Sequence, residues 1–157
     1  MLVIKIKDYG TIKAELRPDV APVTCAHIEE LVKTGFYDGL IFHRVIKNFM
    51  IQGGDPTGTG FGSPDQKKIK GEFAANGVNN PLKHKRGTLS MARSQIMDSA
   101  SSQFFICQVD CAYLDGQYAA FGEVVEGIEV VDKIADTRTD YSDKPIEPVV
   151  IEKMYIE

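Results

Sequence analysis

The chain has no tryptophan, although it contains 8 Phe and 6 Tyr among its 157 residues. Aromatic contacts must therefore come from Phe and Tyr. It also lacks any apolar run near the roughly 20 residues that a membrane-spanning helix needs. The first ten residues, MLVIKIKDYG, alternate apolar and charged side chains from the start, unlike a signal or transit peptide. We therefore expect no membrane segment and no targeting segment.

Cysteines are few, and their spacing fits neither a disulfide framework nor a zinc site. Cys25, Cys107 and Cys111 are odd in number and form no CxxC pair. Zinc sites of Cys/His type need more ligands at close spacing. We predict three free thiols in a reducing compartment, and the cytoplasm is the expected location.

Charge of one sign is not in large excess. The chain has 18 Lys+Arg against 22 Asp+Glu, a net charge of -4, which argues against a dedicated nucleic-acid binder. Two short basic clusters, 67–70 and 83–86, favour solvated loops, with a weak contact to acidic partners as the alternative. With 43% hydrophobic and 25% charged residues, the composition is that of an ordinary globular protein. The length predicts one domain over residues 1–157.

Several catalytic motifs are missing. The glycine-rich stretch 53–62 lacks the third glycine of GxGxxG and is not followed by GK[ST], so it does not predict a phosphate loop. Ser63 lies in a Gly-Ser-Pro turn, and no GxSxG is present. His27, His43 and His84 are scattered without an HExxH or HxH motif. No pair of carboxylates stands out for acid–base work. No metal and no cofactor are therefore expected.

Hydrophobic periodicity predicts a mainly β protein with two helices. Helical spacing covers 22–33 and 127–135, and the Gly-, Pro- and Asn-rich stretch 53–81 predicts a long ordered loop. Strand patterns cover 2–7, 11–16, 40–46, 49–52, 88–92, 103–109, 119–125 and 149–156. Eight short strands with short connections favour a closed eight-stranded antiparallel β-barrel capped by two α-helices.

The strands predicted over 40–46, 49–52 and 103–109 have apolar residues on both faces, but only one of the two faces is purely apolar. Period-two alternation gives one purely apolar set, Ile51, Phe104 and Ile106, which we expect to fill the barrel. That filling argues against a small-ligand barrel of lipocalin type, which needs an open lumen. The opposite set mixes large apolar side chains with polar ones and predicts a ligand groove. Its members are Phe42, Arg44, Ile46, Met50, Gln52, Gln103 and Phe105.

Three sequence blocks around these strands resemble one family. The stretch 42–55, FHRVIKNFMIQGGD, is similar to the FHRxxxxFMxQGGD signature of the cyclophilins, which are peptidyl-prolyl cis/trans isomerases. The block 101–106, SSQFFI, resembles their SQFFI segment. The block 113–116, YLDG, followed by Phe-Gly at 121–122, resembles their WLDG…FG segment. The resemblance covers essentially the whole chain and implies the family's barrel fold and activity.

The resemblance also implies roles for particular residues. Arg44 matches the family's catalytic arginine, and Gln52 is the polar residue that orients it. Tyr113 stands where the family commonly has a tryptophan, and Tyr118 stands where a histidine is usual. The other implied substrate-binding residues are Phe49, Met50, Phe105 and Leu114 around the proline ring, Gln103 beside the groove, and Ala92, Arg93 and Ser94 along the peptide backbone.

The implied partners are proline-containing peptides and folding polypeptides, bound by a monomer. A binding module or chaperone without catalysis is the alternative, and retention of Arg44 and Gln52 disfavours it. Indole N–H donors assist cyclosporin binding in this family. We therefore expect Tyr113 to weaken cyclosporin binding while leaving isomerisation largely intact.

Overall fold

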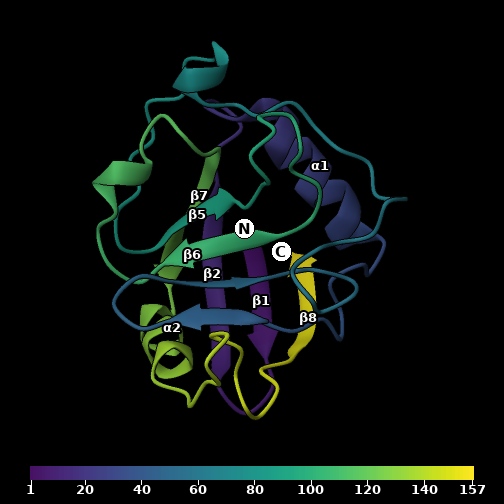
Figure 1. Cartoon of the computed structure of the whole chain (residues 1–157), viewed down its shortest axis with the longest axis vertical. Helices are drawn as coiled ribbons and strands as arrows, with labels where there is room; N and C mark the ends of the chain where they lie inside the picture. The colour runs from purple at the N-terminus through teal and green to yellow at the C-terminus, as the bar shows by residue number, and fades with distance from the viewer.

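Eight antiparallel strands form one curled sheet in the computed structural model, which describes residues 1–157 (Figure 1). The strands are β1 (Leu2–Ile6), β2 (Gly10–Leu16), β3 (Arg44–Ile46), β4 (Met50–Gly53), β5 (Thr88–Met91), β6 (Phe104–Cys107), β7 (Ala120–Glu126) and β8 (Ile151–Ile156). The helices are α1 (Pro22–Lys33) and α2 (Ile128–Ala135), with short 3-10 turns at Ala74–Asn76 and Ala112–Leu114. The prediction of a mainly β fold with two helices is confirmed.

The predicted full closure of the barrel is not seen. The strand order is β3-β4-β6-β5-β7-β2-β1-β8, so β3 and β8 are the two edges and do not pair with each other. Only an isolated bridge, Ile41 with Val150, and bonds such as Phe42 N–H to the Val149 carbonyl at 3.0 Å cross the gap. The sheet is therefore a curled half-barrel, because the chain before β3 reaches β8 too briefly to form a ladder.

The interior of the curled sheet is filled by side chains. Ile51, Phe104 and Ile106 are fully buried there, as predicted, within one cluster of 30 buried residues that spans the chain from Leu2 to Met154. A packed interior leaves no lumen for a small ligand, which excludes the lipocalin-type alternative. The two helices cover opposite ends of the sheet in Figure 1. None of the helices has the length and apolar character that a membrane crossing requires.

Phe42 departs from the predicted groove face. It is fully buried in the main core, where its ring meets Phe104 edge-on at 6.0 Å. The strand predicted over 40–46 begins only at Arg44, so Phe42 lies before it in irregular backbone. Strict alternation holds only where a ladder fixes the pleat, and this explains why the pattern assigned Phe42 to the wrong face.

The long loop between β4 and β5 is fastened to helix α1. The helix has Pro22 in its first turn and no side-chain cap of its own. Instead the buried carboxylate of Glu72 accepts hydrogen bonds from the backbone N–H groups of Val23 at 3.2 Å and Thr24 at 2.6 Å, and from the Thr24 hydroxyl at 2.6 Å. Free N–H groups at a helix start favour such an anion. The loop is therefore ordered, as its turn residues predicted.

Candidate active site

Four side chains form a row across the outer face of the sheet. Arg44 on β3 lies opposite Gln52 on β4, Gln52 lies opposite Phe105 on β6, and Phe105 lies opposite Ser90 on β5. Directly opposed residues of antiparallel strands project from the same face and touch. Residues from three separate parts of the chain are thus brought side by side, and the predicted Arg44, Gln52 and Phe105 are among them.

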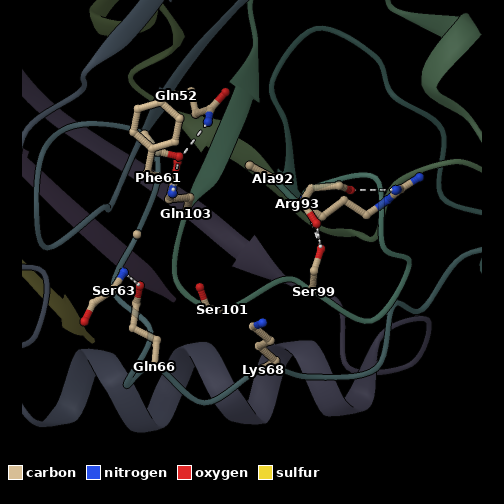
Figure 2. Close-up of a pocket in the computed structure, with 13 residues that line it drawn as sticks. Gln52, Phe61, Ser63, Gln66, Lys68, Ala92, Arg93, Ser99, Ser101 and Gln103 are labelled. Carbon is tan, nitrogen blue, oxygen red and sulfur yellow. Dashed lines mark hydrogen bonds between the residues drawn. The ribbon is translucent and has the colours of Figure 1, made fainter.

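A chain of amide hydrogen bonds runs from Arg44 along this face. The guanidinium Nη1 donates to Oε1 of Gln52 at 3.3 Å, and Nε2 of Gln52 donates to Oε1 of Gln103 at 3.1 Å. Gln103 in turn donates to the Gly60 carbonyl at 3.1 Å. Figure 2 shows Gln52 and Gln103 pointing toward each other. Gln52 therefore restrains a guanidinium that remains exposed to solvent.

An apolar cavity of about 160 Å³ opens next to Arg44. Its lining residues are Arg44, Phe49, Met50, Gln52, Ala92, Arg93, Phe105, Leu114 and Tyr118. Met50 and Phe105 are 1% and 5% exposed, so they lie at its base. The volume is below the several hundred Å³ typical of drug-sized ligand sites. The cavity is therefore sized for one compact side chain, such as the five-membered ring of proline.

Aromatic rings frame this cavity. Tyr118 meets Phe105 edge-on, with centroids 5.9 Å apart and planes at 86°. Tyr113 lies 6.1 Å from the Phe49 ring, but it is 69% exposed and is not among the lining residues. Tyr113 therefore lies beside the rim of the cavity. All nine residues that line the cavity, Arg44 included, belong to the set predicted from the sequence.

A second, polar cavity of about 280 Å³ adjoins the first and shares Gln52, Ala92 and Arg93 with it (Figure 2). Of the predicted residues, Ser94 and Gln103 line this cavity and not the apolar one. Its remaining lining residues are Gly60, Phe61, Gly62, Ser63, Gln66, Lys68, Ser99 and Ser101. Sequence patterns gave no sign of this second cavity, because nearly all of its wall comes from two irregular segments, the loop between β4 and β5 and the one between β5 and β6.

Arg93 is held by its own neighbours. Its guanidinium lies over two rings, Phe73 and Tyr118, each at 4.8 Å from the centroid. It also donates to the Gln117 carbonyl at 2.7 Å and to the Ser94 carbonyl at 2.9 Å. Cation–π contacts and carbonyl bonds together fix a planar guanidinium well. Arg93 therefore shapes the wall between the two cavities, and its charge is already engaged within the protein.

Asp55 organises the loop that walls the polar cavity. Its buried carboxylate accepts bonds from the N–H groups of Thr57 at 2.9 Å, Gly60 at 2.6 Å and Gly62 at 3.1 Å. Burial by itself would raise the pKa of Asp55, but these hydrogen bonds outweigh it and the pKa lies below its ordinary value. The ionised carboxylate is thus the form that the folded loop stabilises.

We expect Asp55→Asn to lower the free energy of unfolding by about 1–3 kcal/mol at pH 7, because an amide accepts fewer of the three N–H bonds. A folded pKa below the unfolded value means that the stabilisation is present at neutral pH and is lost as pH falls through the folded pKa. Urea unfolding of both proteins at pH 7 and near pH 3 measures this. An unchanged difference at the two pH values would contradict the prediction.

Comparison with known proteins identifies the chain. The family model described as "Cyclophilin type peptidyl-prolyl cis-trans isomerase/CLD" matches residues 1–156. The chain belongs to the cyclophilin family. A peptidyl-prolyl cis-trans isomerase of Schizosaccharomyces pombe is 46% identical over 145 residues, covering 92% of this chain and 91% of that protein. Peptidyl-prolyl cis-trans isomerase A of Dickeya dadantii is 44% identical over 156 residues, covering 94% and 80%.

Solved cyclophilin structures share the fold. A Cryptosporidium parvum cyclophilin, crystallised in the presence of the dipeptide Ala-Pro, superposes with a TM-score of 0.90 at 36% identity, covering 99% of this chain and 98% of that one. The cyclophilin AquaCyp293 of Hirschia baltica gives 0.81 at 25% identity, covering 98% and 72%. This cyclophilin is a peptidyl-prolyl cis-trans isomerase, as its sequence blocks predicted.

Proposed function

We propose that this cyclophilin seats a proline ring in the apolar cavity and catalyses rotation of the preceding peptide bond with Arg44. One observation carries the assignment. The row of opposed residues places a guanidinium and its orienting amide, Gln52, at the rim of a small apolar cavity whose base is Met50 and Phe105. Phe49 and Leu114 supply further apolar wall.

The chemistry of the X–Pro bond explains why this arrangement suffices. Rotation faces a barrier near 20 kcal/mol and takes tens to hundreds of seconds unaided. At the twisted transition state amide resonance is lost, the carbonyl is less polarised, and the nitrogen carries a localised lone pair. A group that interacts only with that lone pair lowers the barrier. No covalent intermediate is formed, which agrees with the missing nucleophile motifs.

Arg44 is the proposed donor to the prolyl nitrogen. Its guanidinium is always protonated and presents several N–H groups in a plane. The bond to Gln52 restrains one of these and leaves others free, so the donor is positioned before the substrate twists. The apolar cavity holds the ring still, and the rest of the peptide turns about the bond. Preorganisation and electrostatics together supply the rate enhancement.

The backbone of residues 92–94 is the proposed edge along which the peptide lies. Ala92 and Arg93 belong to both cavities, and Ser94 and Gln103 belong to the polar one, so the segment passes along the junction of the two. Ala92 donates its N–H to the carbonyl of Gln103, the residue before β6, at 3.0 Å, and this bond ties the start of the segment to the start of β6. The Cryptosporidium relative crystallised with Ala-Pro supports a proline-containing ligand.

We also propose the substrates, the domain organisation, the oligomeric state and the cellular location of the enzyme. The proposed substrates are proline-containing peptides and folding polypeptides. The chain would form a single domain over 1–157 and act as a monomer. One continuous core joining both ends of the chain supports the single domain. Three buried free cysteines suit a reducing compartment, and the cytoplasm is our proposed location.

An exchange measurement tests the proposed activity without a coupled protease. Two-dimensional NMR exchange on a short Ala-Pro peptide should show cis and trans signals interconverting within seconds in the presence of the protein. A titration of the same peptide in the same samples measures binding. Binding without accelerated exchange would favour the non-catalytic binding module, and neither binding nor exchange would overturn the proposed site.

Tyr113 should weaken inhibition by cyclosporin. The phenol of Tyr113 is exposed at the rim and has no N–H to donate, unlike the indole that the resemblance to cyclophilins implies at this position. We expect inhibition weaker than nanomolar, and Tyr113→Trp should tighten it about tenfold, the worth of roughly one hydrogen bond. Inhibition of peptide exchange by cyclosporin measures both proteins. Nanomolar inhibition of the unmodified protein would refute this expectation.

A further inference from the structure

A buried histidine lies directly behind the proline cavity. His84, in the loop before β5, is 1% exposed and does not line the cavity. Its imidazole stacks on the Phe105 ring with centroids 6.0 Å apart and planes inclined by 18°. This is an offset-stacked geometry of the kind that aromatic pairs prefer. One face of Phe105 thus rests on a second ring.

The orientation of that second ring is fixed at both nitrogens. Nδ1 of His84 lies 3.0 Å from Oδ1 of Asp115, and Nε2 lies 2.8 Å from the hydroxyl of Ser90. Asp115 also accepts the backbone N–H of His84 at 2.6 Å. Ring rotation about its last side-chain bond would break both ring contacts. A buried imidazole held in this way presents one fixed plane to its neighbours.

The direction of these bonds follows from charge. Burial would raise the pKa of Asp115, but the backbone and ring bonds from His84 lower it, so the carboxylate is ionised and only accepts. Burial also lowers the pKa of His84 more than Asp115 raises it, so the ring is neutral near pH 7. Nδ1 therefore donates to Asp115, and Nε2 accepts from Ser90.

The same three residue types form the triad of serine hydrolases, but the site cannot act as one. Ser90 is fully buried, and it lies opposite Phe105 beneath the groove face, so no ester or amide reaches its hydroxyl. Hydrolysis requires an exposed oxygen and a place for the substrate carbonyl. The bonds of this trio serve an internal, structural purpose.

We infer that His84 is a positioning residue for isomerisation, whose ring, locked by Asp115 and Ser90, holds Phe105 in the orientation that receives the proline ring. The inference rests on the proposed function, since it assumes that Phe105 is the base of the cavity. Tyr118 supports the ring of Phe105 edge-on, so His84 and Tyr118 together restrict its tilt. Catalysis by positioning is sensitive to small displacements of such a wall.

Two substitutions of His84 distinguish the contribution of its stacked ring from that of its hydrogen bonds. His84→Phe keeps a flat ring behind Phe105 and loses both nitrogen bonds, whereas His84→Ala loses the ring as well. We expect kcat/KM for Ala-Pro peptide exchange to fall about threefold for His84→Phe, whose ring has lost the bonds that lock it, and about tenfold or more for His84→Ala, which leaves one face of Phe105 without support. Carbon-detected NMR of the Phe105 ring should show a larger increase in motion in the alanine variant than in the phenylalanine variant.

A matched control guards against mere loss of stability. The control changes Ile4, which is fully buried on β1 and does not line the cavity. Of Ile4→Val and Ile4→Ala, the variant is used whose thermal midpoint is closer to that of His84→Ala. We expect the Ile4 variant to keep the exchange rate of the unmodified protein. Equal loss of activity in His84→Phe and His84→Ala, or loss that follows stability alone, would overturn the inference. If the unmodified protein itself showed no exchange, the proposed function would fail instead.

Discussion

Arg44→Ala should lower kcat/KM for peptide exchange at least a hundredfold, equivalent to about 3 kcal/mol of transition-state stabilisation, while the fold stays intact. Arg44 is exposed and its single side-chain bond is to Gln52, so its removal leaves no buried group without a partner. Its proposed contact with the prolyl nitrogen exists only when the bond is twisted. The loss should therefore fall mainly on kcat.

Two further arginine variants sharpen that measurement. Arg44→Lys keeps the charge but loses the planar donor set and its match to Gln52, so it should recover only part of the rate. Arg138→Ala removes another exposed arginine that makes no ion pair, and it should leave exchange unchanged. NMR exchange on the same Ala-Pro peptide compares all three. Near-normal exchange in Arg44→Ala would remove Arg44 from the proposed mechanism.

Phe105→Ala should weaken binding of proline peptides at least tenfold and slow exchange as well, because it removes the base of the cavity. Truncating a buried phenylalanine also costs about 3–5 kcal/mol of stability. A milder pair, Phe105→Leu and Phe104→Leu, separates the two effects. The residues are adjacent on β6 but face opposite sides of the sheet, one in the small cluster under the cavity and one in the main core.

For that pair we expect similar losses of stability and different effects on peptide affinity. Phe105→Leu should weaken binding, and Phe104→Leu should leave it close to normal. Titration with the Ala-Pro peptide, performed well below the thermal midpoint of each variant, provides the comparison. Unchanged affinity in both Phe105 variants would count against its place as the base of the proline cavity.

Short-range patterns predicted most of the elements because helices and strands are set by neighbours in sequence. Helix α1 begins and ends where its apolar spacing and Pro22 indicated. The strand predicted over 40–46 failed because its first half makes single contacts with the chain around β8 in place of a ladder. The same long-range geometry decided that the sheet stays open between β3 and β8, which no local pattern encodes.

In the proposed site, too, some features follow from local sequence patterns and others only from the packing of the folded chain. Alternation placed Gln52 and Phe105 on a face distinct from the core, and the structure has them opposed in one register. The role of Asp55 in ordering its loop and the stacking of His84 on Phe105 were not predicted. His84 looked like a loop residue in a basic cluster, and only the packing of that loop against β5 and β6 buries it.

Motifs and periodicity lie in neighbouring positions, so the amino-acid sequence alone indicates the family, most of the elements and the residues that we propose carry the chemistry. The absent tryptophan was likewise evident, and with it the expectation for Tyr113. The folded chain was needed to show that these residues line two adjoining cavities, and that the ring of His84 stacks on Phe105 at the base of the apolar one. Strand register and loop packing join residues distant in sequence, and these contacts depend on the folding of the whole chain.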